Sequence, residues 1–118
     1  MSSSKGKTEI QAAEPVLLAE LVNYQDGAIV SRVLFSRETG TITLFAFDEG
    51  QDLSEHSAPF DALVQMIEGE MEISIDRKPL NVKAGHLLLM PANRPHALKA
   101  VTKSKMLLTM IRPYTSTV

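Results

Sequence analysis

Short apolar runs alternate with turn residues along most of this chain of 118 residues. Eight of the runs have the length of β-strands and recur at intervals of about ten residues, a spacing typical of a sandwich or barrel. The expected strands cover residues 16–24, 28–35, 41–47, 62–67, 70–75, 86–90, 96–101 and 106–111. Helical periodicity is hard to find, so the pattern predicts an all-β fold.

Two of the expected strands differ in how many faces they bury. Met71, Ile73 and Ile75 alternate with polar residues, which indicates a strand with one face in the core and one in water. Residues 87–90 are apolar without alternation. A strand of this kind is covered on both faces, so we expect a second sheet or a partner subunit over it.

The segment from Pro59 to Ile67 has an alternative interpretation as a helix, because Pro59 suits a first helical position and Asp61 suits a first turn. Its neighbours favour a strand. A turn at Glu68-Gly69 comes directly before the alternating residues 70–75, and a β-hairpin is the simplest interpretation.

The N-terminal residues differ from the rest of the chain. They are rich in Ser and Lys and lack the apolar run of a secretory signal. We expect a flexible tail over residues 1–14 and a single domain over residues 15–118. No run of about 18 apolar residues occurs, so no membrane partner is expected. These features predict a soluble cytoplasmic protein.

Charge and residue types narrow the classes of partner. A net charge of −2 provides no basic surface for phosphates, so a nucleic acid is not an expected partner. The chain has no cysteine, which excludes disulfides, thiolate zinc sites and catalytic thiols. Any metal would be held by His, carboxylate, amide or water. The expected partner is a small-molecule ligand or substrate.

Two ordered stretches carry the most specific information. In the first, Gly50, His56 and Gly69 are spaced as in the first signature of the cupin superfamily, which this stretch resembles. That signature reads Gly, five residues, His, one, His, three or four, Glu, six, Gly. Here Ala58 stands at the second His and Ala62 at the Glu.

The second stretch resembles the other cupin signature, which reads Gly, five residues, Pro, one, Gly, two, His, three, Asn. Gly85, Pro91 and His96 match, Asn93 replaces the second Gly, and Ala100 replaces the final Asn. Asn tolerates positive φ better than bulkier residues do. With both signatures in the right order, the chain is similar to a small single-domain cupin.

The resemblance implies a double-stranded β-helix, or jelly-roll, barrel with a pocket between two antiparallel sheets. Cupins commonly bind one divalent metal ion through three His and one Glu of the signatures. His56 and His96 remain here, so the resemblance implies a reduced site for one divalent metal ion at this pair. If His96 points inward, alternation also directs Leu98 and Ala100 inward and Lys99 to solvent.

Three further residues are candidates to complete the site. Asp61 is adjacent to the lost Glu position, and Gln65 lies on the same expected strand, although alternation directs Gln65 outward unless a bulge intervenes. Arg94, close to His96, offers a fork of donors to a substrate carboxylate. His86 lies at a strand start, away from both signature ligand positions, and we assign it no role.

Two classes of function remain open. With a metal ion at the histidine pair, the chain would be a metal-dependent oxygenase, isomerase or decarboxylase acting on a small molecule. With two imidazoles that only hydrogen-bond a ligand or water, it would be a non-catalytic binding or sensing cupin. In either case we expect a homodimer, by resemblance to small one-barrel cupins and because the apolar strands near Leu87 and Met106 need cover.

Overall fold

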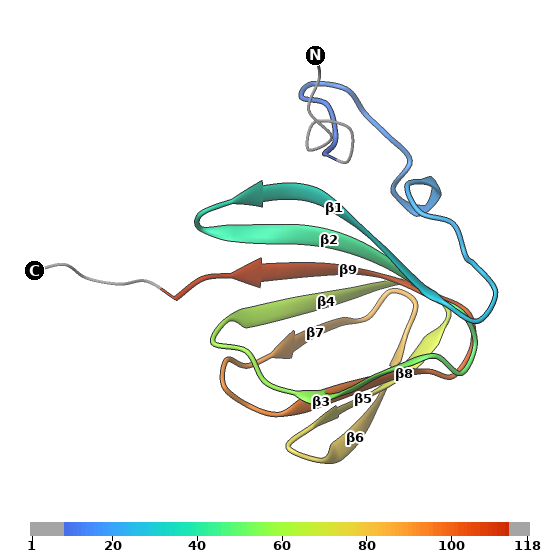
Figure 1. Ribbon diagram of the computed structural model, residues 1–118, viewed down its shortest axis with the longest axis vertical. Helices are drawn as coiled ribbons and strands as arrows, with labels where there is room; N and C mark the ends of the chain where they lie inside the picture. The colour runs from blue at the N-terminus through green and yellow to red at the C-terminus, as the bar shows by residue number, and fades with distance from the viewer. Residues whose placement is uncertain (1–8, 114–118) are drawn as a thin grey trace, which may run out of the picture.

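Nine β-strands form two antiparallel sheets in residues 9–113, the part of the chain that the computed structural model describes (Figure 1). In chain order the strands are β1 (Ile29–Arg37), β2 (Gly40–Phe47), β3 (Asp52–His56), β4 (Asp61–Glu68), β5 (Glu70–Ile75), β6 (Lys78–Lys83), β7 (Leu87–Met90), β8 (His96–Ala100) and β9 (Ser104–Ile111). The five-stranded sheet has the order β1-β2-β9-β4-β7, and the four-stranded sheet has the order β3-β8-β5-β6. The expected all-β jelly-roll fold is confirmed.

The chain passes from one sheet to the other at most of its turns. Among the described strands, only β1 with β2 and β5 with β6 are consecutive in the chain and paired with each other. The last strand, β9, pairs with both β2 and β4 at the centre of the larger sheet (Figure 1). Strands that are distant in sequence therefore become neighbours, and residues from several segments meet at each end of the barrel.

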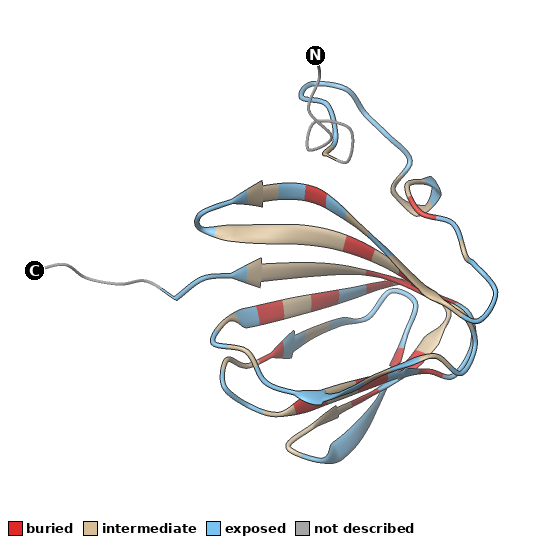
Figure 2. Cartoon of the chain, in the orientation of Figure 1, coloured by how far each residue is buried: buried red, intermediate tan, exposed pale blue. Residues whose placement is uncertain are grey.

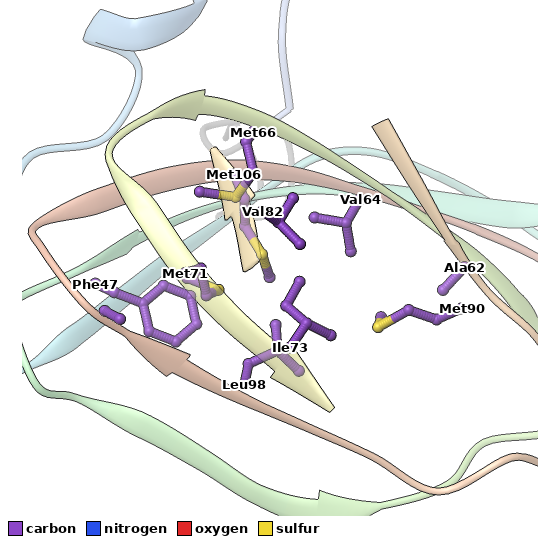
Figure 3. Packing of buried hydrophobic residues seen from close by; sticks show 11 residues of the cluster. Phe47, Ala62, Val64, Met66, Met71, Ile73, Val82, Met90, Leu98 and Met106 are labelled. Atoms are coloured by element: carbon purple, nitrogen blue, oxygen red, sulfur yellow. The ribbon is translucent and has the colours of Figure 1, made fainter. Parts of the chain in front are cut away.

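Alternation along each strand builds the core between the sheets. On β4, Ala62, Val64 and Met66 are buried, whereas Asp61 and Gln65 are exposed (Figure 2). β5 has the expected single wet face. The buried core residues, most of them labelled in Figure 3, are Phe47, Ala62, Val64, Met66, Met71, Ile73, Val82, Met90, Leu98, Ala100 and Met106.

The prediction of a strand over residues 16–24 is wrong. The segment contains one turn of 3-10 helix, η1 (Leu18–Glu20). Leu18, Leu21, Val22 and Tyr24 pack on the outer face of the five-stranded sheet, where Val22 is buried. The carbonyl of Ala19 accepts a hydrogen bond from Lys105 Nζ. The segment is therefore held by packing and side-chain donors in place of strand pairing.

The prediction of a hairpin at Glu68-Gly69 is also wrong, although β4 is the strand that was expected in preference to a helix. β4 and β5 lie in different sheets, because both edges of β4 are occupied by β7 and β9. Gly69 adopts a φ of +80° and carries the chain from one sheet to the other. A tight turn at a glycine can therefore carry the chain from one sheet to another, just as it can join the two strands of a hairpin.

The second sheet does not give residues 87–90 the expected cover on both faces. β7 is an edge strand that directs Leu88 and Met90 towards the core. Leu87 and Leu89 are 67% and 52% exposed on the outer face of the sheet. Cover of this face by a partner subunit stays a prediction.

Part of the expected N-terminal tail contacts β1. The backbone N–H of Ile10 donates to the carbonyl of Leu34 at 3.0 Å, and Glu9 forms an ion pair with Arg37 at 3.6 Å. The remainder of the expected tail, residues 1–8, lies outside the described residues. Within the described part of the chain, no helix has the length and apolar character needed to cross a membrane.

Candidate functional site

The barrel core has two ends with different linings. At the closed end, Phe47, Met66, Met71 and Met106 are no more than 2% exposed and pack together (Figure 3). At the open end, β3, β5 and β9 finish and β2, β4 and β8 begin. The inward residues of the open end are Thr41, Ala62, Ile75, His96 and Met110. Several of these are only half-buried, so the core is accessible from this end.

His56 and His96 meet at the open end. They are register partners on β3 and β8, although 40 residues separate them in the chain. His96 is 8% exposed and follows the expected alternation, with Leu98 and Ala100 buried and Lys99 exposed. His56 is exposed, and its Nε2 lies 3.1 Å from Nε2 of His96. The ring centroids are 4.3 Å apart in an edge-on arrangement.

Backbone carbonyls determine which ring nitrogens carry protons. His56 Nδ1 lies 2.8 Å from the carbonyl of Ser54, and His96 Nδ1 lies 3.2 Å from the carbonyl of Arg94. A carbonyl only accepts hydrogen bonds, so each Nδ1 must donate. In two neutral rings, both Nε2 atoms then carry lone pairs that face each other. Such an arrangement attracts a cation, either a shared proton or a metal ion.

The environment of His96 favours its neutral form. Burial lowers the pKa of His96, the carbonyl of Arg94 opposes that effect, and the neighbouring His56 adds to the lowering. A neutral imidazole is the form that ligates a metal ion. At neutral pH, His96 therefore presents a free Nε2 lone pair at the open end.

The geometry of the pair fits two ligands of one metal ion. Two imidazole nitrogens on a tetrahedral zinc ion lie about 3.3 Å apart, given Zn–N bonds of about 2.05 Å. The observed separation of 3.1 Å is close to this value. Metal-bound histidines also commonly donate their second ring N–H to a carbonyl, as both rings do here. Within residues 9–113, no third His, Cys, Asp or Glu joins the pair.

Asp61 and Gln65 are both exposed on β4. Asp61 is exposed, and its Oδ1 accepts a hydrogen bond from the backbone N–H of Ala92 at 3.0 Å. This bond ties the start of β4 to the loop that follows β7. Gln65 is exposed on the outer face of β4, as strict alternation predicts. Among the described residues, Asp61 is not grouped with the two histidines in a cluster of potential metal ligands.

Arg94 is engaged by a carboxylate of its own protein. Its guanidinium forms an ion pair with Asp76, and its Nε donates to Asp76 Oδ2 at 2.5 Å. The hydrogen bond from Arg94 holds the pKa of Asp76 below its usual range. The structure thus gives Arg94 a partner within the protein, and its expected role towards a substrate stays a prediction.

Comparison with known proteins identifies the family. Residues 43–112, more than half of the chain, match the cupin domain family. The chain belongs to the cupin family. Among solved structures, this cupin is similar to a conserved protein of unknown function from Streptococcus pyogenes. The two are 38% identical, the match covers 90% of this chain and 93% of that chain, and the TM-score is 0.84.

Two further structures are similar to this cupin. A cupin superfamily protein from Desulfitobacterium hafniense is 26% identical over 90% of this chain and 96% of that chain, with a TM-score of 0.83. A cupin 2 conserved barrel domain protein from Leptotrichia buccalis is 42% identical over 80% of this chain and 46% of that chain, with a TM-score of 0.78. No functionally curated protein matches this cupin.

The departures from the cupin signatures have different structural consequences. Asn93 adopts a φ of +64°, so it makes the turn for which the signature has Gly. The backbone N–H of Asn93 donates to the carbonyl of Ala58 at 2.7 Å, which joins the two signature loops. Ala62 is buried at the open end. The turns of the signatures are thus retained, while two ligand positions hold methyl groups.

Sequence reasoning missed a second polar feature of the open end. A cavity of about 30 Å³ is lined by Gly40, Thr41, Phe60, Met110 and Arg112. Its lining comes from the start of β2, the end of β9, the loop between β3 and β4, and the residue that follows β9. Alternation along residues 41–47 could have indicated that Thr41 faces inward. Neither cupin signature includes Arg112, so no motif marked it.

Proposed function

We propose that this cupin binds a small molecule at the open end of its barrel, through a divalent metal ion held by His56 and His96. The 3.1 Å approach of two Nε2 atoms, with each Nδ1 held by a carbonyl, carries the proposal. Among the described residues no third His, Cys, Asp or Glu joins the pair, so water and the ligand would take the remaining coordination positions.

Different residues of the open end would bind the metal ion and the apolar part of the ligand. His56 and His96 would hold the ion, which when bound supplies Lewis-acid chemistry to an oxygen of the ligand. The half-buried side chains of Ile75 and Met110 would contact the apolar part of the ligand and exclude water from it. A metal-dependent oxygenase or isomerase is the enzymatic form of this proposal.

Titration of the metal-free protein with Zn²⁺ in a calorimeter tests the proposal. We expect one site per chain, with binding weakened at least about tenfold in His56→Ala and in His96→Ala. His86→Ala is the matched control, because His86 is exposed and its Nδ1 accepts the backbone N–H of Lys83 at 2.9 Å. Absence of binding, or equal loss in all three variants, would overturn the proposal.

A metal-free binding cupin is the second candidate. Ala58 and Ala62 favour it, because they stand at two of the ligand positions of the first signature. Thermal-shift measurements with small metabolites in the presence of EDTA distinguish the two candidates. A ligand that raises the melting temperature equally with EDTA and with Zn²⁺ supports the metal-free function.

We also propose that two copies of the chain associate through the outer face of the five-stranded sheet. The side chains of Leu87, Leu89 and Ile111 are more than half exposed on this face, and a second copy would cover them. Light scattering should then give twice the chain mass. The double variant Leu87→Glu/Leu89→Glu should be monomeric, and Leu80→Glu on the other sheet should stay dimeric. A monomeric unmodified protein contradicts the proposal.

A further inference from the structure

The hydroxyl of Thr41 is buried at the open end and has no hydrogen-bond partner among the described residues. Thr41 lies on β2 opposite Met110, whose side chain packs against the core, so Thr41 faces inward as well. Among residues 9–113, no group hydrogen-bonds to Thr41 Oγ1. Folded proteins pair nearly all of their buried polar atoms. The orphaned hydroxyl therefore points to a partner from outside the described residues.

A guanidinium lies at the same cavity. Arg112 lines the cavity together with Thr41, and its guanidinium carbon lies 5.5 Å from the centroid of the Phe60 ring. The backbone N–H of Arg112 donates to the carbonyl of Thr39 at 2.9 Å, which fixes the base of the side chain. No carboxylate of the described residues pairs with Arg112, in contrast to Arg37, Arg77 and Arg94.

We propose that this cavity binds the carboxylate of a small ligand, with Arg112 forming an ion pair with it and Thr41 Oγ1 donating a hydrogen bond to it. A guanidinium presents two parallel N–H groups that match the two oxygens of a carboxylate. The volume of about 30 Å³ accommodates roughly one water-sized polar group. The rest of the ligand must therefore extend out of the cavity.

The cavity and the histidine pair lie at the same end of the barrel. Phe60 follows His56 by four residues in the chain, so their Cα atoms are at most about 14 Å apart. Phe60 and Met110 give the cavity apolar walls. A carboxylate with an apolar body of a few carbon atoms suits this combination. The inference rests on the proposed function, because it names the chemical class of the ligand for the same end of the barrel.

Paired probes that differ only in charge test the inference. Benzoate and benzamide have nearly the same shape, and only benzoate presents a carboxylate. We expect benzoate, titrated into the ¹⁵N-labelled protein, to shift the backbone amide signals of Thr41 and Met110. Benzamide should bind at least about tenfold more weakly, because it cannot form the charged hydrogen bonds to Arg112.

Variants of the two cavity residues separate binding from folding. Arg112→Gln should weaken benzoate binding at least about tenfold, and Thr41→Val about two- to tenfold. Thr41→Val should not lower the melting temperature of the free protein, because it replaces an unpaired hydroxyl with a methyl group. Arg37→Gln is the matched control, since Arg37 also stacks on an aromatic ring, Phe35, at 3.9 Å.

Five outcomes decide the inference. Equal affinity for benzoate and benzamide, or unchanged binding in Arg112→Gln, overturns it. Inorganic phosphate that binds as tightly as benzoate through Arg112 overturns the carboxylate assignment. Benzoate binding that depends on Arg112 and not on Arg37 supports it. If that dependence appears while Zn²⁺ fails to bind, the cavity assignment stands and the metal part of the proposed function fails.

Discussion

The closed and open ends of the barrel differ in how their buried polar groups are hydrogen-bonded. At the closed end, the fully buried hydroxyl of Ser104 lies 3.0 Å from the carbonyl of Glu70 and 2.8 Å from that of Thr102. At the open end, Thr41 Oγ1 has no partner among the described residues, and the Nε2 atoms of His56 and His96 face each other. The unpaired hydroxyl and the two facing imidazole nitrogens are the reason that the proposed binding site is placed at the open end.

Packing is also tighter at the closed end than at the open end. The closed end is filled by one aromatic and three methionine side chains that are almost fully buried. Met110, at the open end, is only half-buried. A tightly filled core resists change in volume, whereas a partly open one relaxes around a substitution. We therefore expect stability to depend mainly on the closed end and the proposed binding on the open end, which substitutions at each end can test.

Matched methionine substitutions should give the largest difference between the ends. We expect Met71→Ala to lower the free energy of unfolding by about 2–5 kcal/mol, because Met71 is fully buried and its removal leaves a cavity. Met110→Ala should cost less than half as much, because that side chain is already partly in water. Urea denaturation measures both values. Equal losses would show that the open end contributes to the core as strongly as the closed end.

Glycine substitutions should give the next largest effect. A Cβ at Gly69, in the turn at the closed end, would lie 2.1 Å from the carbonyl oxygen of Lys103 and 2.9 Å from Cα of Ser104. The backbone there would have to shift, and φ is +80°. We expect Gly69→Ala to lower the free energy of unfolding by about 2–4 kcal/mol.

Gly85→Ala is the control for that turn. Gly85 also has positive φ, at +92°, but a Cβ there meets nothing within 4 Å among the described residues. Only the backbone strain remains, so the expected loss is about 1–2 kcal/mol. Thermal or urea unfolding of the two variants compares them directly. If Gly69→Ala loses no more than Gly85→Ala, the closed end is less rigid than its packing indicates.

Local features of the sequence predicted most of the strands. Residues 41–47 and 70–75 were expected as strands and lie within β2 (Gly40–Phe47) and β5 (Glu70–Ile75). Alternation and turn residues act over a few positions, so they can be recognised in a single sequence. The crossing at Gly69 could not be predicted in this way. It depends on which strands occupy the two edges of β4, and those strands come from distant parts of the chain.

The candidate site likewise has one part that the sequence predicted and one part that it did not. The cupin signatures pointed to His56 and His96, and the register of β3 and β8 brings them into contact. Arg94 was expected beside the pocket, yet a guanidinium pairs with the carboxylate that the fold brings nearest, here Asp76. The cavity at Thr41 and Arg112 joins strand ends that are far apart in sequence, so no spacing pattern could reveal it.

The smallest expected effect is a loss of stability at acidic pH that arises from His96 at the open end. Burial lowers the pKa of His96 in the folded protein, so at mildly acidic pH the unfolded chain binds a proton that the folded chain does not. The stabilising effect of neutral His96 is complete above pH about 6.5 and is lost as the pH falls towards its pKa in the folded protein. The slope from this one group cannot exceed about 1.4 kcal/mol per pH unit.

Removing the ring of His96 should therefore flatten the response to acid. We expect the free energy of unfolding of His96→Gln to change less between pH 7.5 and about pH 5 than that of the unmodified protein. His86→Gln, which leaves the open end intact, should keep the full dependence. Urea denaturation across this range measures it. If His96→Gln and the unmodified protein respond equally to acid, the open end does not hold His96 in its neutral form, and its contrast with the closed end is weaker than the geometry indicates.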